Sequence, residues 1–249
     1  MKLNRPGPAV LVAGALLFLG CSTPKYVNYW SQWRDWRSSV PWGWNIATER
    51  AGDDYAITNL IGPFAPEFYH GVPSFSVRWY RNKAAHRLPD GMSEAYRDAD
   101  DFIKQTLAVV YGGNYTLVSA AQDAQKRHPD SEITEVYVSG RKAKHFVVVS
   151  SVEVPIDTPY GVLKDRKNGH ATLVRMHEYV VVPMSTGFYA IVYPATPSGF
   201  DLFSPQFNAF VNKFTIAKEG PAGAALAIPT LGGEPAASAP MATQVKGKK

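Results

Sequence analysis

A single cysteine, Cys21, limits how this chain of 249 residues can hold itself together. One thiol cannot form a disulfide within the chain, and it cannot supply a cysteine-based zinc or iron–sulfur site. The fold must therefore be stabilised by burying apolar side chains. The composition allows this, because 45% of the residues are hydrophobic and 19% are charged, as is usual for one domain of good size or two small ones.

The net charge of +5 comes largely from the two ends of the chain. Lys2 and Arg5 contribute +2, and residues 219–249 contribute +1, so the body of the chain carries only about +2. Proteins that bind nucleic acid usually concentrate basic charge on one face. The charge therefore gives no reason to expect a nucleic-acid partner.

The first 20 residues have the order of a secretory signal peptide. Lys2 and Arg5 precede an uncharged, mostly apolar run of 12 residues at 9–20, which is shorter than the roughly 20 residues of a membrane-spanning helix. The alternative is a buried core helix. We expect a signal peptide over residues 1–20, because positive charge followed by an apolar run at the N-terminus is the secretory pattern.

The apolar run ends in residues 17–21 (LFLGC), which resemble the lipobox of bacterial lipoproteins, with Phe18 where leucine is commonest. The resemblance implies lipidation of the Cys21 thiol, cleavage after Gly20 and acylation of the new amino group by a fatty acid such as palmitate. Several acyl chains would anchor the protein strongly, since each buried CH₂ contributes about 0.8 kcal/mol. Ser22 replaces the aspartate that often retains lipoproteins in the inner membrane. We therefore expect a lipid-anchored envelope protein on the outer membrane, facing the periplasm.

Residues 22–41 are unusually aromatic. Five aromatic residues are spaced as they would be on one face of a helix: Tyr26, Tyr29, Trp30, Trp33 and Trp36. Two interpretations stay open: an element that lies on the bilayer beside the lipid anchor, or a segment that packs back onto the domain. We assign residues 21–41 to the lipid anchor and an aromatic juxtamembrane segment, and begin the folded domain at residue 42.

Between residues 42 and 217 the hydrophobic pattern favours several strands. They are predicted from alternation and from Val, Tyr and Thr content at 42–46, 55–61, 73–80, 133–138, 146–154, 171–182 and 187–193. A basic loop at 164–170 could bind an anion, but Asn168-Gly169 is a strong turn dipeptide. We interpret this loop as a solvated hairpin tip.

Two helices are expected. Apolar residues at spacings of three and four predict the first from Tyr96 to Val110, with Asp90 as its cap. Ser204 as N-cap and Pro205 in the first turn predict the second, whose aromatic stripe at Phe207, Phe210 and Phe214 should face a sheet. We interpret three acids of the first helix as a solvated face rather than as catalytic or metal-binding groups: Asp98, Asp100 and Asp101.

Residues 218–249 are expected to be disordered. More than half of the positions from 219 onward are Gly, Ala or Pro, and none is aromatic. Such a segment cannot bury enough apolar area to offset its chain entropy.

The order of three strands, a helix, several long strands and an aromatic C-terminal helix resembles the PsbP-like superfamily. The resemblance rests on residues 41–44 (PWGW) and on residues 187–193 (GFYAIVY) followed by the aromatic helix. This superfamily includes a photosystem II extrinsic protein, a Ran-binding nuclear-transport factor and bacterial lipoproteins of the DcrB/LpqN type. It implies an α+β fold over residues 42–217, with an antiparallel sheet between helices (an α/β/α sandwich), and a mostly non-catalytic protein that docks onto other proteins.

Sequence signatures of catalysis are mostly absent: there is no G-x-S-x-G, P-loop, H-E-x-x-H or G-x-G-x-x-G motif, and we interpret the S-x-x-K matches at Ser22 and Ser139 as chance. We expect a membrane-tethered, non-catalytic binding module that docks onto another envelope protein, with no cofactor and no bound metal. The alternatives are an envelope hydrolase with His and Asp from different strands, and a carrier with a small-molecule or lipid cavity between sheet and helix. We place the docking surface on the outer sheet face or a sheet edge near Arg78, Tyr80 and Arg81.

Overall fold

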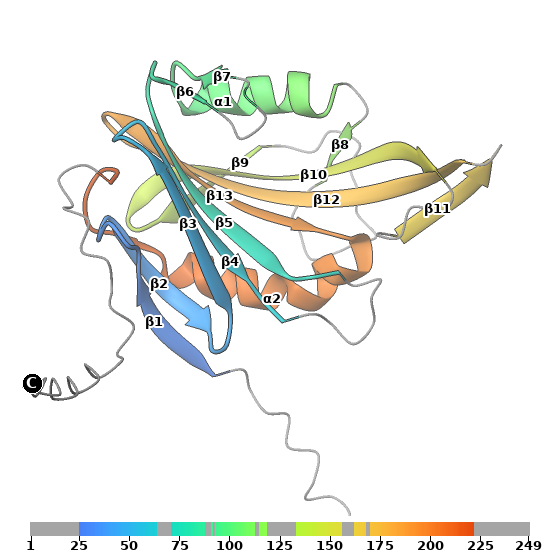
Figure 1. Cartoon of the computed structure of the whole chain (residues 1–249), viewed down its shortest axis with the longest axis horizontal. Helices are drawn as coiled ribbons and strands as arrows, with labels where there is room; N and C mark the ends of the chain where they lie inside the picture. Colours follow the sequence, from blue (N-terminus) through green and yellow to red (C-terminus); the bar gives the residue numbers. More distant parts are fainter. Residues whose placement is uncertain are drawn as a thin grey trace, which may run out of the picture.

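The computed structural model describes residues 25–63, 71–87, 91, 93–112, 115–118, 133–155, 162–167 and 170–221 (Figure 1). Cys21, the predicted signal peptide and residues 222–249 of the predicted tail lie outside these ranges. The predictions made for them stay predictions.

Within these ranges, nine strands pair into one antiparallel sheet at the centre of the molecule. The main path is β3-β4-β5-β13-β12-β10-β8, while β11 pairs with β12 and β9 pairs with β10. The bounds are β3 (Asn45–Ala51), β4 (Tyr55–Ile61), β5 (Ser74–Arg81), β8 (Tyr115–Val118), β9 (Thr134–Val138), β10 (Arg141–Pro155), β11 (Val162–Lys167), β12 (His170–Pro183) and β13 (Gly187–Ala195). The predicted hairpin is confirmed by the pairing of Lys167 with His170, but the predicted loop at 164–170 is too long, because β11 extends to Lys167 and β12 begins at His170.

One face of the sheet is covered by α2 (Pro197–Lys213), which lies below the strands in Figure 1. Strand residues reach this face at every second position, as the pleat requires. Phe75, Val77 and Trp79 of β5 are buried there with the aromatic stripe of α2. The ring centroids of Phe75 and Phe207 are 5.2 Å apart at an interplanar angle of 62°, an edge-to-face arrangement that aromatic pairs favour.

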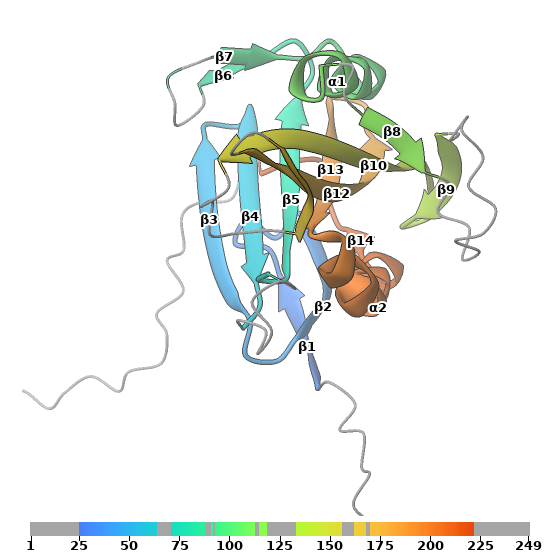
Figure 2. The ribbon, with the colours of Figure 1, turned by 90° about the vertical axis from the view of Figure 1, so that its right-hand side faces the viewer.

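The opposite face is covered at one end by α1 (Ala99–Gln105), by a π-helical turn η2 (Thr106–Val110), and by the small hairpin of β6 (Ala85–Arg87) and β7 (Ser93–Ala95) (Figures 1 and 2). Phe102 and Ile103 of α1 are buried in a second apolar cluster with Tyr80 and Phe188. The predicted α+β class, with an antiparallel sheet between helices, is therefore confirmed.

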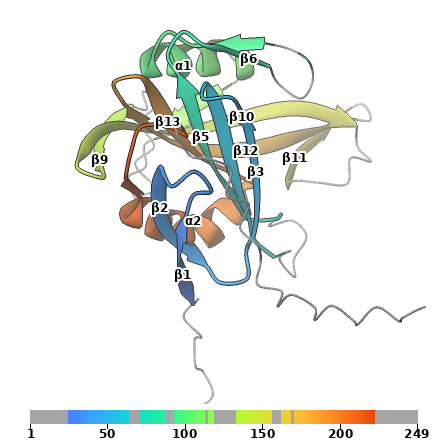
Figure 3. The same ribbon diagram turned by 60° about the vertical axis from the view of Figure 1, so that its left-hand side comes forward.

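The aromatic segment before residue 42 is part of this fold. It forms a hairpin of β1 (Tyr26–Trp30) and β2 (Trp36–Pro41), and β2 also pairs with β14 (Thr215–Ile216). Figure 3 shows the hairpin beside α2. Trp36 is 1% exposed, and its ring stacks on Phe214 with centroids 5.2 Å apart.

The predicted helical face at residues 26–36 is therefore wrong, and so is a domain boundary at residue 42. The aromatic spacing combined residues from both faces of β1 with residues of the following turn. In β2 the buried positions follow the strand period of two, at Trp36, Ser38 and Val40. Burial of Trp33 and Trp36 leaves Tyr26 and Trp30 as the exposed aromatic residues of this hairpin.

The first helix is shorter than predicted. Its N-cap is Asp98, whose carboxylate accepts a hydrogen bond from the Asp101 N–H at 2.8 Å. Asp101 is itself buried and accepts from Arg97 and Gln105. Two of the three acids therefore organise the helix start, and the predicted cap Asp90 lies outside the described ranges.

The second helix begins earlier than predicted. Thr196 is its N-cap, with the hydroxyl accepting from the Gly199 N–H at 3.0 Å, and Pro197 occupies its first position. Pro205, the predicted start, lies inside the helix. The local signal at Ser204-Pro205 is overridden because an equivalent Thr-Pro signal comes eight residues earlier. The longer helix adds Phe200 to the face that packs on Tyr193 (centroids 5.3 Å apart).

The fold also extends past residue 217, where the tail was predicted to begin. Glu219 accepts hydrogen bonds at 2.6–3.1 Å from the main chain and hydroxyls of Ser185 and Thr186, in the turn between β12 and β13. The Gly220 N–H donates to the Tyr189 hydroxyl at 2.9 Å. Residues 218–221 are therefore held against the domain.

Candidate functional site

Polar side chains gather on the α1-side face of the sheet, on β5 and β12. Ser74, Ser76 and Arg78 share the face of buried Tyr80, because alternate residues of β5 point the same way. On β12, Arg175 and His177 share the face of Tyr179 for the same reason. Since β13 lies between β5 and β12, the two polar sets flank one strand.

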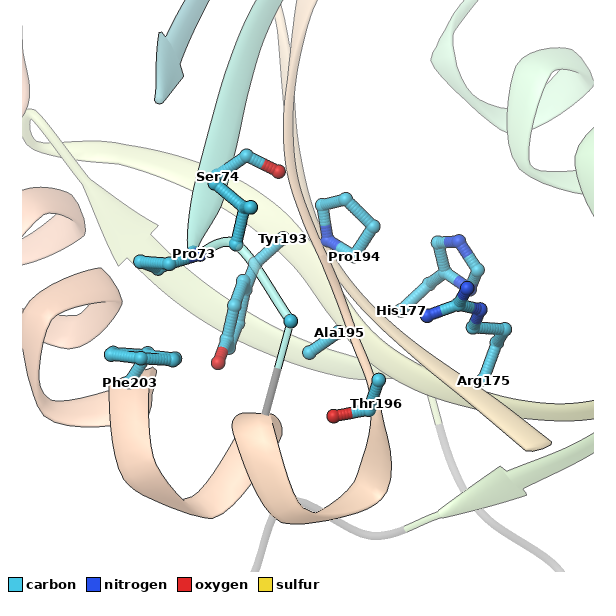
Figure 4. Close-up of a pocket in the computed structure, with 11 residues that line it drawn as sticks. Pro73, Ser74, Arg175, His177, Tyr193, Pro194, Ala195, Thr196 and Phe203 are labelled. Carbon is cyan, nitrogen blue, oxygen red and sulfur yellow. The ribbon is translucent and has the colours of Figure 1, made fainter. Parts of the chain in front are cut away.

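A cavity of about 230 Å³ lies where β13 ends and α2 begins (Figure 4). Arg175 and His177 lie on one side of it and Phe203 on the other. The residues that line it are Gly71, Val72, Pro73, Ser74, Arg175, His177, Tyr193, Pro194, Ala195, Thr196 and Phe203. The cavity therefore combines a basic and hydroxyl-bearing wall, which supplies most of its exposed surface, with a smaller apolar part.

Among the described residues, the basic wall of the cavity faces no acidic side chain. None of the lining residues is Asp or Glu. In the part of the chain that the structure describes, Arg175 makes no ion pair, and Nδ1 of His177 is buried without a hydrogen-bond partner. Burial, together with the positive charges of Arg175 and Arg78, lowers the pKa of His177 to about 4. His177 is therefore neutral near pH 7.

The sequence did not single out Arg175 and His177 as a pair. They lie two residues apart within a strand that was predicted at 171–182, so the strand pattern predicts that both side chains point to the same face of the sheet. Their place beside Ser74 and Pro194 depends on the sheet order β5-β13-β12, which the strand patterns do not specify.

The three residues predicted to mark a docking surface lie in different environments. Tyr80 is 3% exposed and packs on Phe188, with ring centroids 5.2 Å apart. Arg78 is half-buried and its Nε donates to Ser76 Oγ at 3.3 Å. Arg81 is exposed, and its guanidinium lies 3.5 Å from the Asp54 carboxylate.

A docking surface at Tyr80 is therefore wrong. Strand β5 is an interior strand between β4 and β13, and α1 covers the face to which Tyr80 belongs. The alternation of apolar and polar residues in β5 predicts one buried face, but it does not predict that α1 covers the other face as well.

One His–Glu pair bears on the hydrolase alternative. His145 Nε2 lies 2.8 Å from Glu178 Oε1, and Thr134 Oγ1 lies 3.5 Å from His145 Nδ1. The Thr134 hydroxyl donates to the main-chain oxygen of His145 at 3.3 Å. An activated nucleophile lies within about 2.6–3.2 Å of its base, so we interpret these contacts as ties between β9, β10 and β12.

Among the described residues, no three His, Cys, Asp or Glu side chains come together as a metal site would require. No helix in the described ranges is long and apolar enough to cross a membrane.

No family model matches the chain, and no curated protein matches it in sequence. Solved structures resemble its fold at low identity. The solution structure of cyanobacterial PsbP (CyanoP) from Synechocystis sp. PCC 6803 is 9% identical with a TM-score of 0.40, over 79% of this chain and 95% of that one. A crystal structure from Bacteroides thetaiotaomicron is 8% identical, with a TM-score of 0.36. The alignment covers 77% of this chain and about half (48%) of the Bacteroides chain.

Proposed function

We propose that this protein is a lipid-anchored, non-catalytic binding module of the bacterial envelope. It is tethered through Cys21 to a membrane, which we take to be the outer membrane because Ser22 follows the cysteine. It docks onto another envelope protein.

The docking part of the proposal rests on the sheet edge formed by β3. Six of the seven residues of β3 are exposed. On one side β3 pairs with β4; on the other, no strand within the described ranges pairs with it (Figure 2). An unpaired edge offers main-chain N–H and C=O groups to an added strand of a partner. Strand β3 contains no proline, a residue that commonly blocks such edges.

The tether part of the proposal is supported by the hairpin end that follows Cys21. Trp42 is 73% exposed, and its main-chain N–H donates to the Lys25 carbonyl oxygen at 2.7 Å. Only three residues separate Lys25 from Cys21. An exposed tryptophan beside a lysine suits the interface of a bilayer, where Trp and basic residues are enriched.

Docking is tested by site-specific photocrosslinking in cells. A photoreactive amino acid replaces Ala47, which is exposed in the middle of β3, or Asn208, which is exposed on α2 and serves as the matched control. We expect the Ala47 probe to form a discrete adduct with one envelope protein and the Asn208 probe to form none. Equal adducts at both positions, or none at Ala47, would contradict docking through β3.

The tether is tested by density-gradient fractionation of membranes, together with the intact mass of the purified protein. Wild type should sediment with a membrane fraction and carry acyl mass. The Cys21→Ala variant should keep its signal peptide or become soluble. A soluble, unacylated wild type would rule out the lipid anchor.

A further inference from the structure

We propose that the cavity at the end of β13 binds a small organic acid, with its carboxylate held by Arg175 and His177 and its apolar part against Pro73, Pro194 and Phe203. This site is separate from the β3 edge and from the lipid anchor, so it stands or falls independently of the proposed docking function.

The geometry brings the two basic side chains to one wall. Arg175 and His177 are two residues apart on β12 and point to the same face. The acid nearest in sequence, Glu178, points to the opposite face, where it is paired with His145. The half-buried guanidinium of Arg175 therefore lines the cavity without a carboxylate partner among the residues that the structure describes.

The surrounding charges favour an anion over a cation or a neutral ligand. The groups that face His177 are Arg175 on its own strand, Arg78 on β5, and the tyrosines Tyr111 and Tyr179, whose rings lie 5.6 and 6.4 Å from its ring. None of these groups is an acid that ionises at neutral pH. A bound carboxylate would offset the charge of Arg175 through a charge-assisted hydrogen bond, with the imidazole as a second donor.

The size and lining of the cavity restrict the class of ligand that it can hold. Its volume of about 230 Å³ is below the roughly 300–1,000 Å³ of pockets that hold drug-sized ligands. The part of the lining away from Arg175 includes Pro73, Ala195 and Phe203, so a ligand that reaches them from Arg175 should carry an apolar group. A compact monocarboxylate fits this combination better than a free inorganic anion.

The test uses benzoate as probe and benzamide as its neutral counterpart of the same shape. Full-length protein, purified in detergent with ¹³C-labelled histidine, is titrated with each probe and followed at the His177 resonance. We expect benzoate to bind at least tenfold more tightly than benzamide, because only benzoate forms an ionic hydrogen bond with Arg175. Saturating benzoate should also raise the pKa of His177, since it offsets the repulsion from Arg175.

Variants then locate the site. Arg175→Gln should weaken benzoate binding at least tenfold, whereas Arg141→Gln, an exposed arginine at the start of β10, should leave it unchanged. The comparison of benzoate with benzamide on wild type needs no variant, so it remains decisive if Arg175→Gln fails to fold. Equal affinity for the two probes, no saturable binding at millimolar concentrations, or inorganic phosphate binding as tightly as benzoate would overturn the proposal.

Discussion

At the scale of single residues, the buried carboxylate of Asp35 joins segments far apart in the sequence. It accepts from Ser31 in its own turn and from the Tyr189 hydroxyl of β13 at 2.8 Å. The same hydroxyl accepts from the Gly220 N–H. Burial raises the pKa of Asp35, and the hydrogen bonds from Ser31 and Tyr189 oppose this rise by stabilising the carboxylate.

Replacing Tyr189 with phenylalanine removes that hydroxyl and little else. The buried carboxylate and the Gly220 N–H each lose a partner, so we expect Tyr189→Phe to lower the free energy of unfolding by about 2 kcal/mol. Urea unfolding followed by circular dichroism measures this loss. The control is Tyr137→Phe, whose side chain is 71% exposed and should change stability by less than about 0.5 kcal/mol. Equal losses in the two variants would show that the Asp35 network contributes nothing.

Glu219 predicts a dependence of stability on pH. Hydrogen bonds from Ser185 hold the pKa of Glu219 below its ordinary value of 4.5. Hydrogen bonds from Thr186 lower the pKa in the same direction, and slight burial opposes them. A carboxyl with a lowered pKa in the folded state stabilises the fold above its unfolded pKa and loses this effect as the pH falls through the folded pKa. The stability difference between wild type and Glu219→Gln should therefore be largest above about pH 4.5 and shrink toward pH 3. A difference that stays constant from pH 6 to pH 3, measured by urea unfolding, would contradict this.

At the scale of elements, the start of β13 depends on a residue without a side chain. A Cβ on Gly187 would collide with the main-chain oxygen of Tyr80 and lie 2.6 Å from the Trp79 ring. We expect Gly187→Ala to lower the free energy of unfolding by about 3 kcal/mol, because both neighbours are fixed by the sheet. Gly140→Ala is the comparison, since nothing lies within 4 Å of its added Cβ and its φ of +73° alone should cost about 1 kcal/mol. A smaller loss at Gly187 than at Gly140, measured by urea unfolding, would contradict this account.

The elements also show what the sequence could predict. Strands β5 and β13 were predicted within two residues of their observed bounds, because their apolar runs are stopped by glycine, proline or charge. The start of α2 was missed because Thr196-Pro197 and Ser204-Pro205 are equivalent local signals, and packing against the sheet selects the earlier one. The cavity at Arg175 and His177 was missed because it is assembled from three strands and the start of a helix.

At the scale of the whole molecule, the β1–β2 hairpin gives the protein a side that can face a membrane. Its inner residues are buried against α2, while Tyr26 and Trp30 are exposed, and the guanidinium groups of Arg34 and Arg37 lie within 5.5 Å of the Trp30 ring centroid. Trp42 adds a second exposed indole near the end of the hairpin that follows Cys21. Aromatic and basic side chains at a lipid anchor favour contact with anionic lipid.

With the proposed lipid anchor at Cys21, this orientation predicts that the folded domain retains weak affinity for anionic bilayers when the anchor is removed. Soluble Cys21→Ala protein should cosediment with vesicles containing anionic lipid, and less with neutral vesicles, because each basic residue near the surface contributes about 1 kcal/mol. Adding Trp42→Ala should weaken binding about fivefold, the equivalent of about 1 kcal/mol for a partly inserted indole. Tyr137→Ala removes an aromatic side chain of similar exposure from β9 and should leave binding unchanged. If both substitutions weaken binding alike, the hairpin does not face the bilayer.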